Sequence, residues 1–391
     1  MPGIIAQPGG IISGMLVPSK WVMRTLVAGA TAMVILGGFG LYWQGLASDW
    51  LAYYAAGHFL LDGRLAQVYD LPILQAWQAS IIGQQITPFL YAPVYSLPFA
   101  SLALLTPWAA RWAWLAIGII AGLAAARLST RWSGLSFPVS MVALLAFPPF
   151  AFSLAVGQIS PITLLIFAGV TVLEWAKRRD ASSGLLAGLA LYKPQQLIPL
   201  VVYWLASRRW RSLLGFAGAA VLIGLVSYLI SPQSMTAYLA LSRSFFSLAK
   251  STTASGANIS LYAISPWVGL LTLAGVLVLL VVISVRRPDS RYLAAVLWLA
   301  PVLAAPYIVI YDMLLVALPI SILAPALRKD RLLQAGVILV WLAAFLAPFV
   351  VATRPVTWAV LVLYALCFRK ALQDRPEIRL LESHDVIESD H

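Results

Sequence analysis

Long apolar runs, separated by short basic connectors, make up almost the whole chain. A run of about 20 apolar residues is long enough for a helix to cross a bilayer. Residues 22–43 form the first such run, and further runs follow between residues 108 and 368. The pattern predicts an all-α, polytopic integral membrane protein with about 10–12 transmembrane helices.

Most Lys and Arg residues fall in clusters between the apolar runs. The clusters are Arg127/Arg131, Lys177/Arg178/Arg179, Arg208/Arg209/Arg211, Arg286/Arg287/Arg291, Arg328/Lys329/Arg331 and Arg369/Lys370. An excess of Lys and Arg marks the cytoplasmic loops of membrane proteins. We therefore assign all six clusters to the cytoplasm, and each interval between clusters must contain an even number of crossings or a re-entrant excursion.

One interval does not fit this rule. Residues 89–128 begin outside and end inside, yet they contain two apolar runs. Either one run is re-entrant or the Arg127 cluster is external. We predict a re-entrant segment at 89–105, because its three prolines suit a broken helix packed inside protein.

This topology predicts a cytoplasmic segment at 1–20, a transmembrane domain at 21–370 and a cytoplasmic tail at 371–391. Two outer loops are expected, at 47–88 and 231–266. The first should carry amphipathic surface helices at 49–61 and 74–82. The first apolar run is too long for a signal-peptide core, so we expect a permanent helix. The acidic tail is typical of a disordered segment.

The composition supports a membrane protein. Of the 391 residues, 61% are hydrophobic and 10% charged, far from the quarter-charged composition of soluble domains. The net charge of +12 would suggest nucleic acid in a soluble protein, but here the basic residues are topology signals, so no nucleic-acid partner is expected. The single cysteine, Cys367, excludes a disulfide framework and a cysteine metal site.

Six of the fourteen acids lie in the last eighteen residues, and three more fall within one unusual stretch, residues 48–70. A carboxylate beside a membrane is costly enough to need a reason. Asp49 is the candidate for chemistry, although capping of the helix that begins there would also explain it. Asp62, followed by Gly63, fits a helix end better than a site. His58 has no spaced partners and is a poor metal ligand.

Further polar residues interrupt the later apolar runs. Gln158 lies in a predicted outer turn, Lys193 separates two short half-helices, and Tyr311 with Asp312 lies within an apolar run. The predicted topology places them on the same side as Asp49, which favours a polar cavity. A structural Lys193–Asp312 ion pair is the alternative for those two residues, and helix cross-linking is the alternative for Gln158 and for Asn258.

Five segments of the chain, in order, resemble those of the glycosyltransferase family 87 membrane proteins. They are DWLAYYAAGHFLLDGRLAQVYD (D-x-x-x-Y-x-A…L-x-G…Y-D in the family), FLYAPVYSLPF (F-x-Y-P-P, with Ala92 in place of the first proline), FPPFAFSLAVGQIS (P-P…G-Q), AGLALYKPQQLIPLVVYWLASRRWR (A-G…K-P…R-R-W) and YIVIYDMLL (Y-D). The resemblance implies a GT-C type fold. It also implies transfer of a hexose, with mannose the first candidate, from a polyprenyl-phosphate donor to a lipid or glycan hydroxyl outside the cytoplasmic membrane.

By this resemblance Asp49 matches the position of the general base, and Lys193 matches a position that we assign to the donor phosphate. Some relatives carry a His near the late motif, which leaves the role of Tyr311 and Asp312 open. The expected substrate-binding residues are Tyr53, Tyr69, Asp70, Tyr91, Gln158, Asn258, Tyr311 and Asp312. No metal or cofactor is expected, because the donor carries one phosphate and the chain has no carboxylate pair at ligand spacing.

Two other functions remain open from the sequence. A transporter or flippase of polyprenyl-linked sugars would also need an outward cavity with buried polar groups, and a membrane scaffold would need no chemistry. The acid-bearing helix directly after the first span favours an enzyme over these two functions, because a transporter does not need such a helix.

Overall fold

The structure is a computed structural model that describes residues 19–44, 49–83, 87–176, 180–244, 258–287, 290–346 and 355–373. Helices and short connections make up these residues, which contain no strand. The all-α prediction is therefore confirmed for the described part of the chain. Residues 1–18 and 374–391, where most of the predicted N-terminal segment and tail fall, lie outside it.

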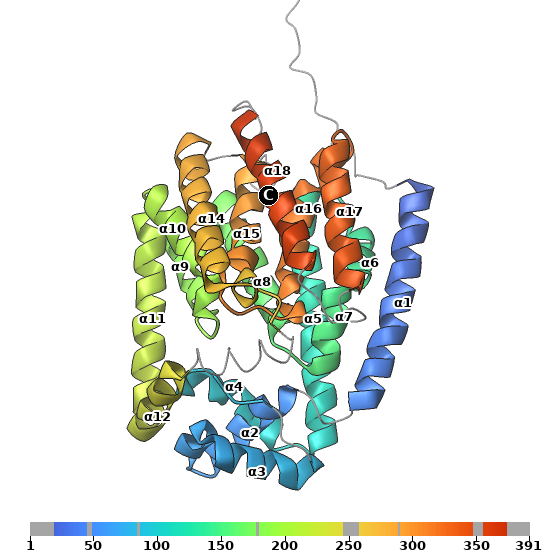
Figure 1. The fold of residues 1–391 in the computed structure, drawn as a ribbon. Helices are drawn as coiled ribbons and strands as arrows, with labels where there is room; N and C mark the ends of the chain where they lie inside the picture. Colours follow the sequence, from blue (N-terminus) through green and yellow to red (C-terminus); the bar gives the residue numbers. More distant parts are fainter. Residues whose placement is uncertain are drawn as a thin grey trace, which may run out of the picture.

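Among the residues that the structure describes, six helices are long and apolar enough to cross a membrane. They are α1 (Lys20–Gln44), α5 (Pro107–Ser133), α11 (Trp210–Ile230), α14 (Pro266–Arg286), α16 (Ala317–Leu327) with the 3-10 turn before it (Ile310–Val316), and α18 (Pro355–Gln373). Most of them stand side by side in one block (Figure 1). The chain is thus a multi-pass membrane protein.

Shorter helices complete the block. The helices α6 (Phe137–Leu145) and α7 (Pro148–Val156) meet at a 66° bend and together make a seventh possible span. The others are α8 (Ser160–Thr171), α9 (Asp180–Gly188), α10 (Ile198–Ala206), α15 (Arg291–Ala304) and α17 (Arg331–Leu346). Our estimate of about 10–12 crossings included these shorter helices. The outer turn predicted at Gln158 occupies residues 157–159, and the residues before it form helix α7.

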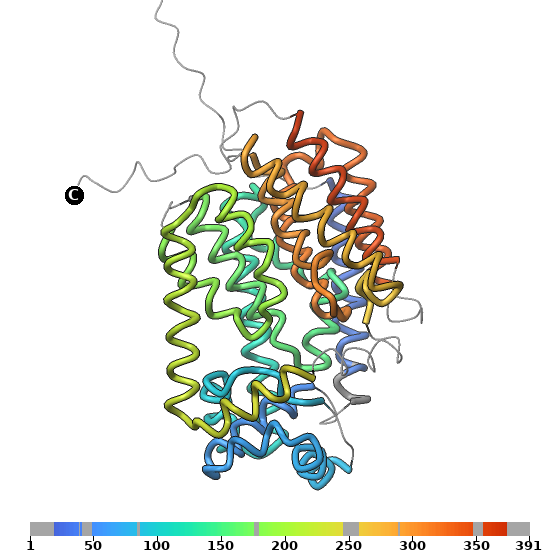
Figure 2. Tube along the Cα trace, turned by 60° about the vertical axis from the view of Figure 1, so that its left-hand side comes forward, coloured from blue at the N-terminus to red at the C-terminus, as the bar shows by residue number. Residues whose placement is uncertain are grey.

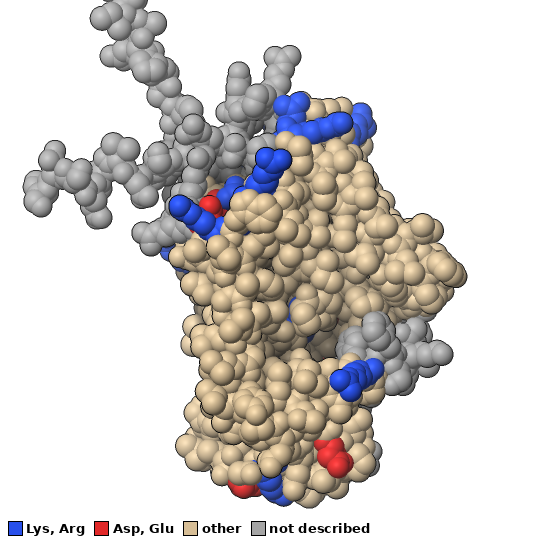
Figure 3. All heavy atoms as spheres, turned by 90° about the vertical axis from the view of Figure 1, so that its left-hand side faces the viewer, with Lys and Arg blue, Asp and Glu red and all other residues tan. Residues whose placement is uncertain are grey.

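Lys and Arg side chains gather at one end of the molecule, which we call the basic end, and a band of other residues lies below it (Figure 3). The helix α1 begins at this end with Lys20, α5 ends here near Arg131, and α18 ends here near Lys370. The described basic clusters therefore share one side of the molecule, as the positive-inside rule predicts, while residues 177–179 lie outside the described residues.

Four helices form a layer at the opposite end, which we call the distal layer (Figures 1 and 2). They are α2 (Trp50–Leu61), α3 (Leu71–Ile82), α4 (Leu97–Ala103) and α12 (Pro232–Arg243). The segment that we expected to re-enter the membrane, 89–105, instead runs through this layer as a 3-10 turn and α4. Only α5 then crosses between residues 89 and 128, so the basic clusters keep their common side.

The helix predicted at 49–61 exists as α2, but it is buried rather than lying along a surface. Nine of its residues are buried, because its sequence is apolar all round and offers no polar face. The helix α4 crosses it at Gly57, where a Cβ would lie 2.2 Å from the Phe99 carbonyl oxygen. The amphipathic helix of this layer is α3, which buries Leu74 and Gln78 and leaves its other side more open.

Candidate functional site

Asp49 lies at the start of α2, where its carboxylate accepts two side-chain hydrogen bonds. Gln158 Nε2 donates to Oδ2 at 2.5 Å, and Thr87 Oγ1 donates to Oδ1 at 3.2 Å. The Asp49 side chain makes no capping bond to the helix, so helix capping does not explain this acid. Both bonds come from neutral donors, and the residue remains partly exposed.

Tyr53 follows Asp49 at helical spacing and reaches the same amide. Residues four apart share one face of a helix, so the D-x-x-x-Y motif presents both side chains together. The Tyr53 hydroxyl donates to Gln158 Oε1 at 2.9 Å and lies 3.0 Å from the Tyr91 hydroxyl. One glutamine amide thus joins α2 to the turn after α7.

The turn that carries Gln158 is fixed by α5. Trp114 Nε1 donates to the Gly157 carbonyl at 2.7 Å, and Arg111 Nη2 donates to the carbonyls of Leu154 and Ala155 at the end of α7. Gly157 has a left-handed φ of +69°, and a Cβ there would lie 2.6 Å from the Trp50 Cβ. Only glycine fits this turn, which places Gln158 against Asp49.

Stacked and edge-on tyrosines connect this group to Lys193. The Tyr53 and Tyr91 rings lie 5.6 Å apart, and Tyr91 meets Tyr192 edge-on at the same separation. The Tyr192 hydroxyl is 2.8 Å from Thr163 Oγ1 on α8. Lys193 comes directly after Tyr192, in the connection between the half-height helices α9 and α10. The aromatic contacts therefore join the distal layer to the helix block.

Lys193 forms a buried ion pair with Asp312, the alternative that the sequence left open. Nζ lies 2.5 Å from Oδ1, and both side chains are largely buried. Gln196 Nε2 also donates to Oδ1 at 3.2 Å, and the Val309 backbone N–H donates to Oδ2 at 3.2 Å. The ammonium sits 5.1 Å from the centre of the Tyr311 ring. Asp312 thus holds Lys193 in one position.

The Asp49 carboxylate and the Lys193–Asp312 ion pair act on each other electrostatically. Burial raises the pKa of the Asp49 carboxyl above its ordinary value, whereas the hydrogen bonds from Gln158 and Thr87 and the positive charge of Lys193 lower it. The negative charge of Asp312 raises it. Figure 3 shows a recess between the helix block and the distal layer, with Lys or Arg atoms visible inside it. The arrangement offers a partly exposed carboxylate in range of a buried cation.

Tyr69 and Asp70 occupy different environments. The Tyr69 hydroxyl donates to the Tyr91 carbonyl at 2.8 Å, and its ring packs near Phe89 and Tyr238. Asp70 is exposed, and its carboxylate accepts from the Ile73 N–H as the N-cap of α3. Tyr69 therefore supports the Tyr91 segment, while the Asp70 carboxylate caps α3.

Asn258 lies in a structural cross-link rather than against the Asp49 group. Its Oδ1 accepts from the backbone N–H groups of Ser260 and Ile308, and its Nδ2 donates to the Pro306 carbonyl at 3.3 Å. These bonds tie the segment before α14 to the segment after α15. Asn258 thus fixes the loop that leads to Tyr311 and Asp312, and contact with a substrate stays a prediction.

Asp62 and Gly63 end α2, as the sequence indicated. Asp62 is the C-cap of the helix, and Gly63 adopts a left-handed φ of +70°. An exposed ion pair joins Asp62 to Arg64 at 2.9 Å. His58 contacts the rings of Tyr54 and Trp77. Within the described ranges, no three His, Cys, Asp or Glu side chains come together in a way that could hold a metal ion.

Sequence reasoning missed two important polar residues. Thr87 donates to Asp49 but lies in a polar stretch with no recognisable spacing. Glu174 is fully buried near the basic end, where its carboxylate accepts from Ser183, Ser212 Oγ (3.0 Å) and Trp204 Nε1 (2.9 Å) and pairs with Arg209 (2.9 Å). A signal for Glu174 existed, because it is the only glutamate before Glu377 and lies within an apolar run.

Comparison with known proteins gives one match. Searches among curated proteins and among solved structures return no significant similarity. The model of glycosyltransferase family 87 matches residues 89–306, more than half of the chain. The matched range contains Tyr91, Gln158, Lys193 and Asn258, whereas Asp312 lies just after it and Asp49 lies well before it. The chain, which is helical and multi-pass, therefore belongs to glycosyltransferase family 87 and is a membrane glycosyltransferase.

Proposed function

We propose that the protein transfers a hexose, with mannose the first candidate, from a polyprenyl-phosphate donor to a hydroxyl of a lipid or glycan acceptor, with inversion. The observation that carries this proposal is the pairing of a partly exposed, neutrally hydrogen-bonded Asp49 with a buried lysine that acts on it electrostatically. A base and a cation are the two groups that this transfer needs. The arrangement corresponds to a GT-C type enzyme.

The orientation follows from the basic end. Since Lys and Arg clusters mark the cytoplasmic side, the basic end faces the cytoplasm and the distal layer lies outside the cytoplasmic membrane. Asp49 then faces the periplasm or cell exterior, where a polyprenyl-linked sugar is available and a nucleotide sugar is not.

Asp49 acts as the general base. The acceptor oxygen attacks the anomeric carbon while its proton passes to a carboxylate oxygen, and the bond from the anomeric carbon to the phosphate oxygen breaks. Each Asp49 oxygen has one described side-chain donor, so a second lone pair on each stays available to the acceptor. Burial raises the pKa of this carboxyl, which brings its basicity closer to the working pH of the enzyme.

Lys193 stabilises the polyprenyl phosphate as it leaves. The ammonium has three N–H donors, and the Asp312 contact at 2.5 Å occupies one of them. A phosphate that approaches the remaining donors would receive a charge-assisted hydrogen bond. Asp312, itself held by Gln196 and the Val309 N–H, acts by positioning the lysine.

The aromatic groups between the two ends provide the sugar site. The rings of Tyr53 and Tyr91 stack on each other, and their hydroxyl groups are hydrogen-bonded. The ring of Tyr311 faces the Lys193 ammonium. Such faces and hydroxyls suit a hexose, which has apolar ring faces and polar edges. Tyr69, Asp70, Gln158 and Asn258 complete the set of residues that we assign to the substrates or to their immediate support.

The direct test is to incubate purified protein with a panel of polyprenyl-phosphate sugars and measure which donor is consumed in the presence of membrane acceptors. We expect release of polyprenyl phosphate from one hexose donor and no consumption of the matching nucleotide sugar. Use of a nucleotide sugar alone would contradict the proposal. Movement of an intact donor across vesicles without bond cleavage would support the transporter that the sequence left open.

The lysine has a test of its own. In Lys193→Ala the partner Asp312 is left buried without its cation, so the protein would also lose stability. The double variant Lys193→Ala/Asp312→Asn removes both charges. If Lys193 binds the donor phosphate, both variants raise the KM for the donor by about tenfold or more, the value of one charge-assisted hydrogen bond. A normal donor KM in the folded double variant would rule out this contact.

A further inference from the structure

A second cavity lies inside the helix block, away from Asp49 and Lys193. It has a volume of about 510 Å³ and is enclosed by residues from α1, α5, α6, α8, α16 and α17. This volume falls within the usual range of small-molecule sites, about 300–1,000 Å³. The site proposed for sugar transfer contributes none of its lining residues.

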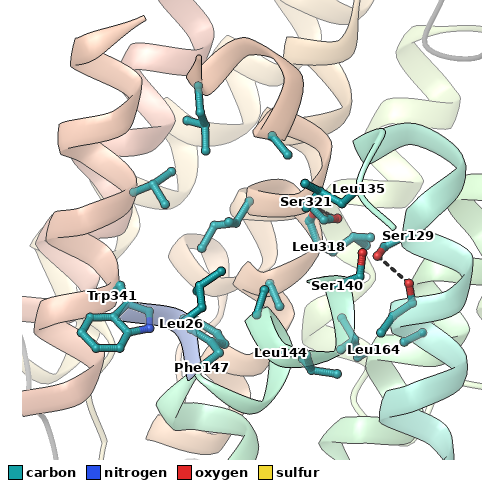
Figure 4. Close-up of a pocket in the computed structure, with 18 of the residues that line it drawn as sticks. Leu26, Ser129, Leu135, Ser140, Leu144, Phe147, Leu164, Leu318, Ser321 and Trp341 are labelled. Carbon is teal, nitrogen blue, oxygen red and sulfur yellow. Dashed lines mark hydrogen bonds between the residues drawn. The ribbon is translucent and has the colours of Figure 1, made fainter. Parts of the chain in front are cut away.

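The lining is largely apolar, with a group of three serine hydroxyls in it. Figure 4 shows Ser129, Ser140 and Ser321 together on one side, and Leu144, Phe147 and Leu164 apart from them. Ser129 and Ser140 lie near the ends of α5 and α6 that face the basic end. Apolar residues also line the cavity near the basic end, where Leu135 follows α5 and Leu327 precedes Arg328, so the hydroxyl groups lie within an apolar lining.

Ser140 is the unusual member of the hydroxyl group. Ser129 donates to the Ala126 carbonyl and Ser321 to the Leu318 carbonyl, which satisfies their hydrogens within their own helices. The Ser140 oxygen is buried and has no hydrogen-bond partner among the described residues. A buried hydroxyl without a partner is destabilising, because its lost bonds to water are not replaced. This cost would be relieved by an acceptor, such as an ester carbonyl, placed in the cavity.

Positive charge surrounds the ends of the helices that enclose the cavity. The basic residues are Lys20 and Arg24 of α1, Arg127 and Arg131 of α5, and Arg328, Lys329 and Arg331 between α16 and α17. The nearby acid, Asp330, is already paired with Lys370 at 2.5 Å. An anionic headgroup at this surface would be attracted by each basic residue close to it.

We propose that this cavity binds one anionic phospholipid from the cytoplasmic leaflet. An acyl chain fills the apolar part, where an empty space would forfeit dispersion contacts. An ester carbonyl accepts from the Ser140 hydroxyl, and the phosphate lies among the basic residues at the surface. The donor's isoprenoid chain fits less well, because we place the donor phosphate toward the distal layer, away from these basic residues. The proposal rests on the orientation given above but not on the transfer reaction.

The first experiment uses native mass spectrometry of the detergent-solubilised protein with phosphatidylglycerol or phosphatidylcholine of the same acyl chains. We expect one retained phosphatidylglycerol, preferred over phosphatidylcholine by about tenfold or more, since two or three basic residues contribute. In Ala324→Phe the new ring occupies the cavity and retention falls at least as far. The matched control Ala217→Phe adds the same ring to an exposed position on α11 and leaves retention unchanged.

A second experiment does not depend on any variant folding. Phosphatidylglycerol with a photoreactive diazirine in its acyl chain is reconstituted with the wild-type protein, and crosslinked peptides are mapped. Crosslinks concentrated on α6 and α16 support the site, whereas crosslinks spread evenly over the outer faces of α11 and α14 would overturn it.

Two further outcomes would also overturn the proposal. One is equal retention of the two lipids, or retention unaffected by Ala324→Phe. The other is displacement of phosphatidylglycerol by polyprenyl phosphate, together with a raised donor KM in Ala324→Phe. That result would assign the cavity to the donor chain. If the wild-type protein retains phosphatidylglycerol but transfers no sugar from any polyprenyl-phosphate donor, only the proposed function is contradicted. The two proposals can therefore fail separately.

Discussion

Two carboxylates, at opposite ends of the molecule, are held in very different ways. Glu174 near the basic end is completely buried and has three side-chain donors and the Arg209 guanidinium around it. Asp49 in the distal layer has two neutral donors, no cation in direct contact among the described residues, and partial exposure. Burial of a charge needs compensation, and only Glu174 receives it from a direct ionic partner.

The difference separates a structural acid from a reactive one. Glu174 joins the segment after α8 to α9, α10 and α11 through a carboxylate whose charge is already neutralised. Asp49 keeps an uncompensated part of its burial cost, which appears as a raised pKa. A carboxylate with this property has affinity for a proton and room for a substrate, and the predictions below test that contrast.

The largest effect is expected for Asp49→Asn. The amide keeps the size of the side chain but cannot accept the acceptor proton, so the turnover number should fall by about 10²–10⁴, the usual contribution of a general base. The melting temperature in detergent should stay the same or rise, because a buried charge is removed. Wild-type turnover on the true acceptor would exclude Asp49 as the base.

For Glu174→Gln we expect the opposite result. The variant leaves Arg209 without its closest partner and should lower the free energy of unfolding by about 1–3 kcal/mol, the cost of a buried unsatisfied group. Denaturant unfolding would measure this loss. Turnover per folded molecule should stay near the wild-type value, and a selective loss of turnover at unchanged stability would contradict a structural role.

The pH dependence of the reaction sharpens the contrast further. Because the pKa of Asp49 is raised, the wild-type rate should rise with pH as the carboxylate forms and should be low below that pKa. Gln158→Leu removes a donor that stabilises the carboxylate, so the ascending limb should move to higher pH.

The ascending limb of the pH–rate profile also provides the control for Gln158→Leu. Glu174→Gln should leave the pH profile in place, since that residue does not contact the reacting groups. A Gln158→Leu profile that moved to lower pH, or did not move, would disconnect Gln158 from the ionisation of Asp49.

The smallest effect is expected at Asp330, a third acid that lies near the basic end. A hydrogen bond from Lys370 lowers the pKa of Asp330, so its stabilising contribution is present at neutral pH and is lost as the pH falls through the lowered pKa. Asp330→Asn should cost about 0.2–1 kcal/mol at pH 7, as for other solvent-accessible ion pairs. The thermal stabilities of variant and wild type should converge in acid.

The sequence predicted the architecture well where a local pattern decides it. Hydrophobic runs located the long helices, and the basic clusters gave their common end, because both depend on composition within a short window. The apolar spacing from residue 49 to 61 predicted the helix α2 for the same reason. The sequence analysis predicted wrongly that α2 lies along the surface. Its burial depends on packing against other segments such as α4, which no local pattern reveals.

The site itself depends on contacts that no local pattern contains. Gln158 is 109 residues from Asp49, and Asp312 is 119 residues from Lys193. The sequence could nominate these residues as rare polar groups on one predicted side, and it included the Lys193–Asp312 pair as an alternative. It could not show that Thr87 donates to Asp49 or that Glu174 sits among four partners, since those contacts require the folded helices.

The Lys193–Asp312 pair also has a consequence for biosynthesis. A ribosome adds about 5–20 residues per second, so the 119 residues between the two partners take roughly 6–24 s to synthesise. During that time α9 and α10 enter the membrane with a lysine whose counter-ion does not yet exist. Nascent chains that stop before Asp312 should therefore be the ones that membrane quality control recognises, and the site becomes complete only when the last quarter of the protein begins to emerge.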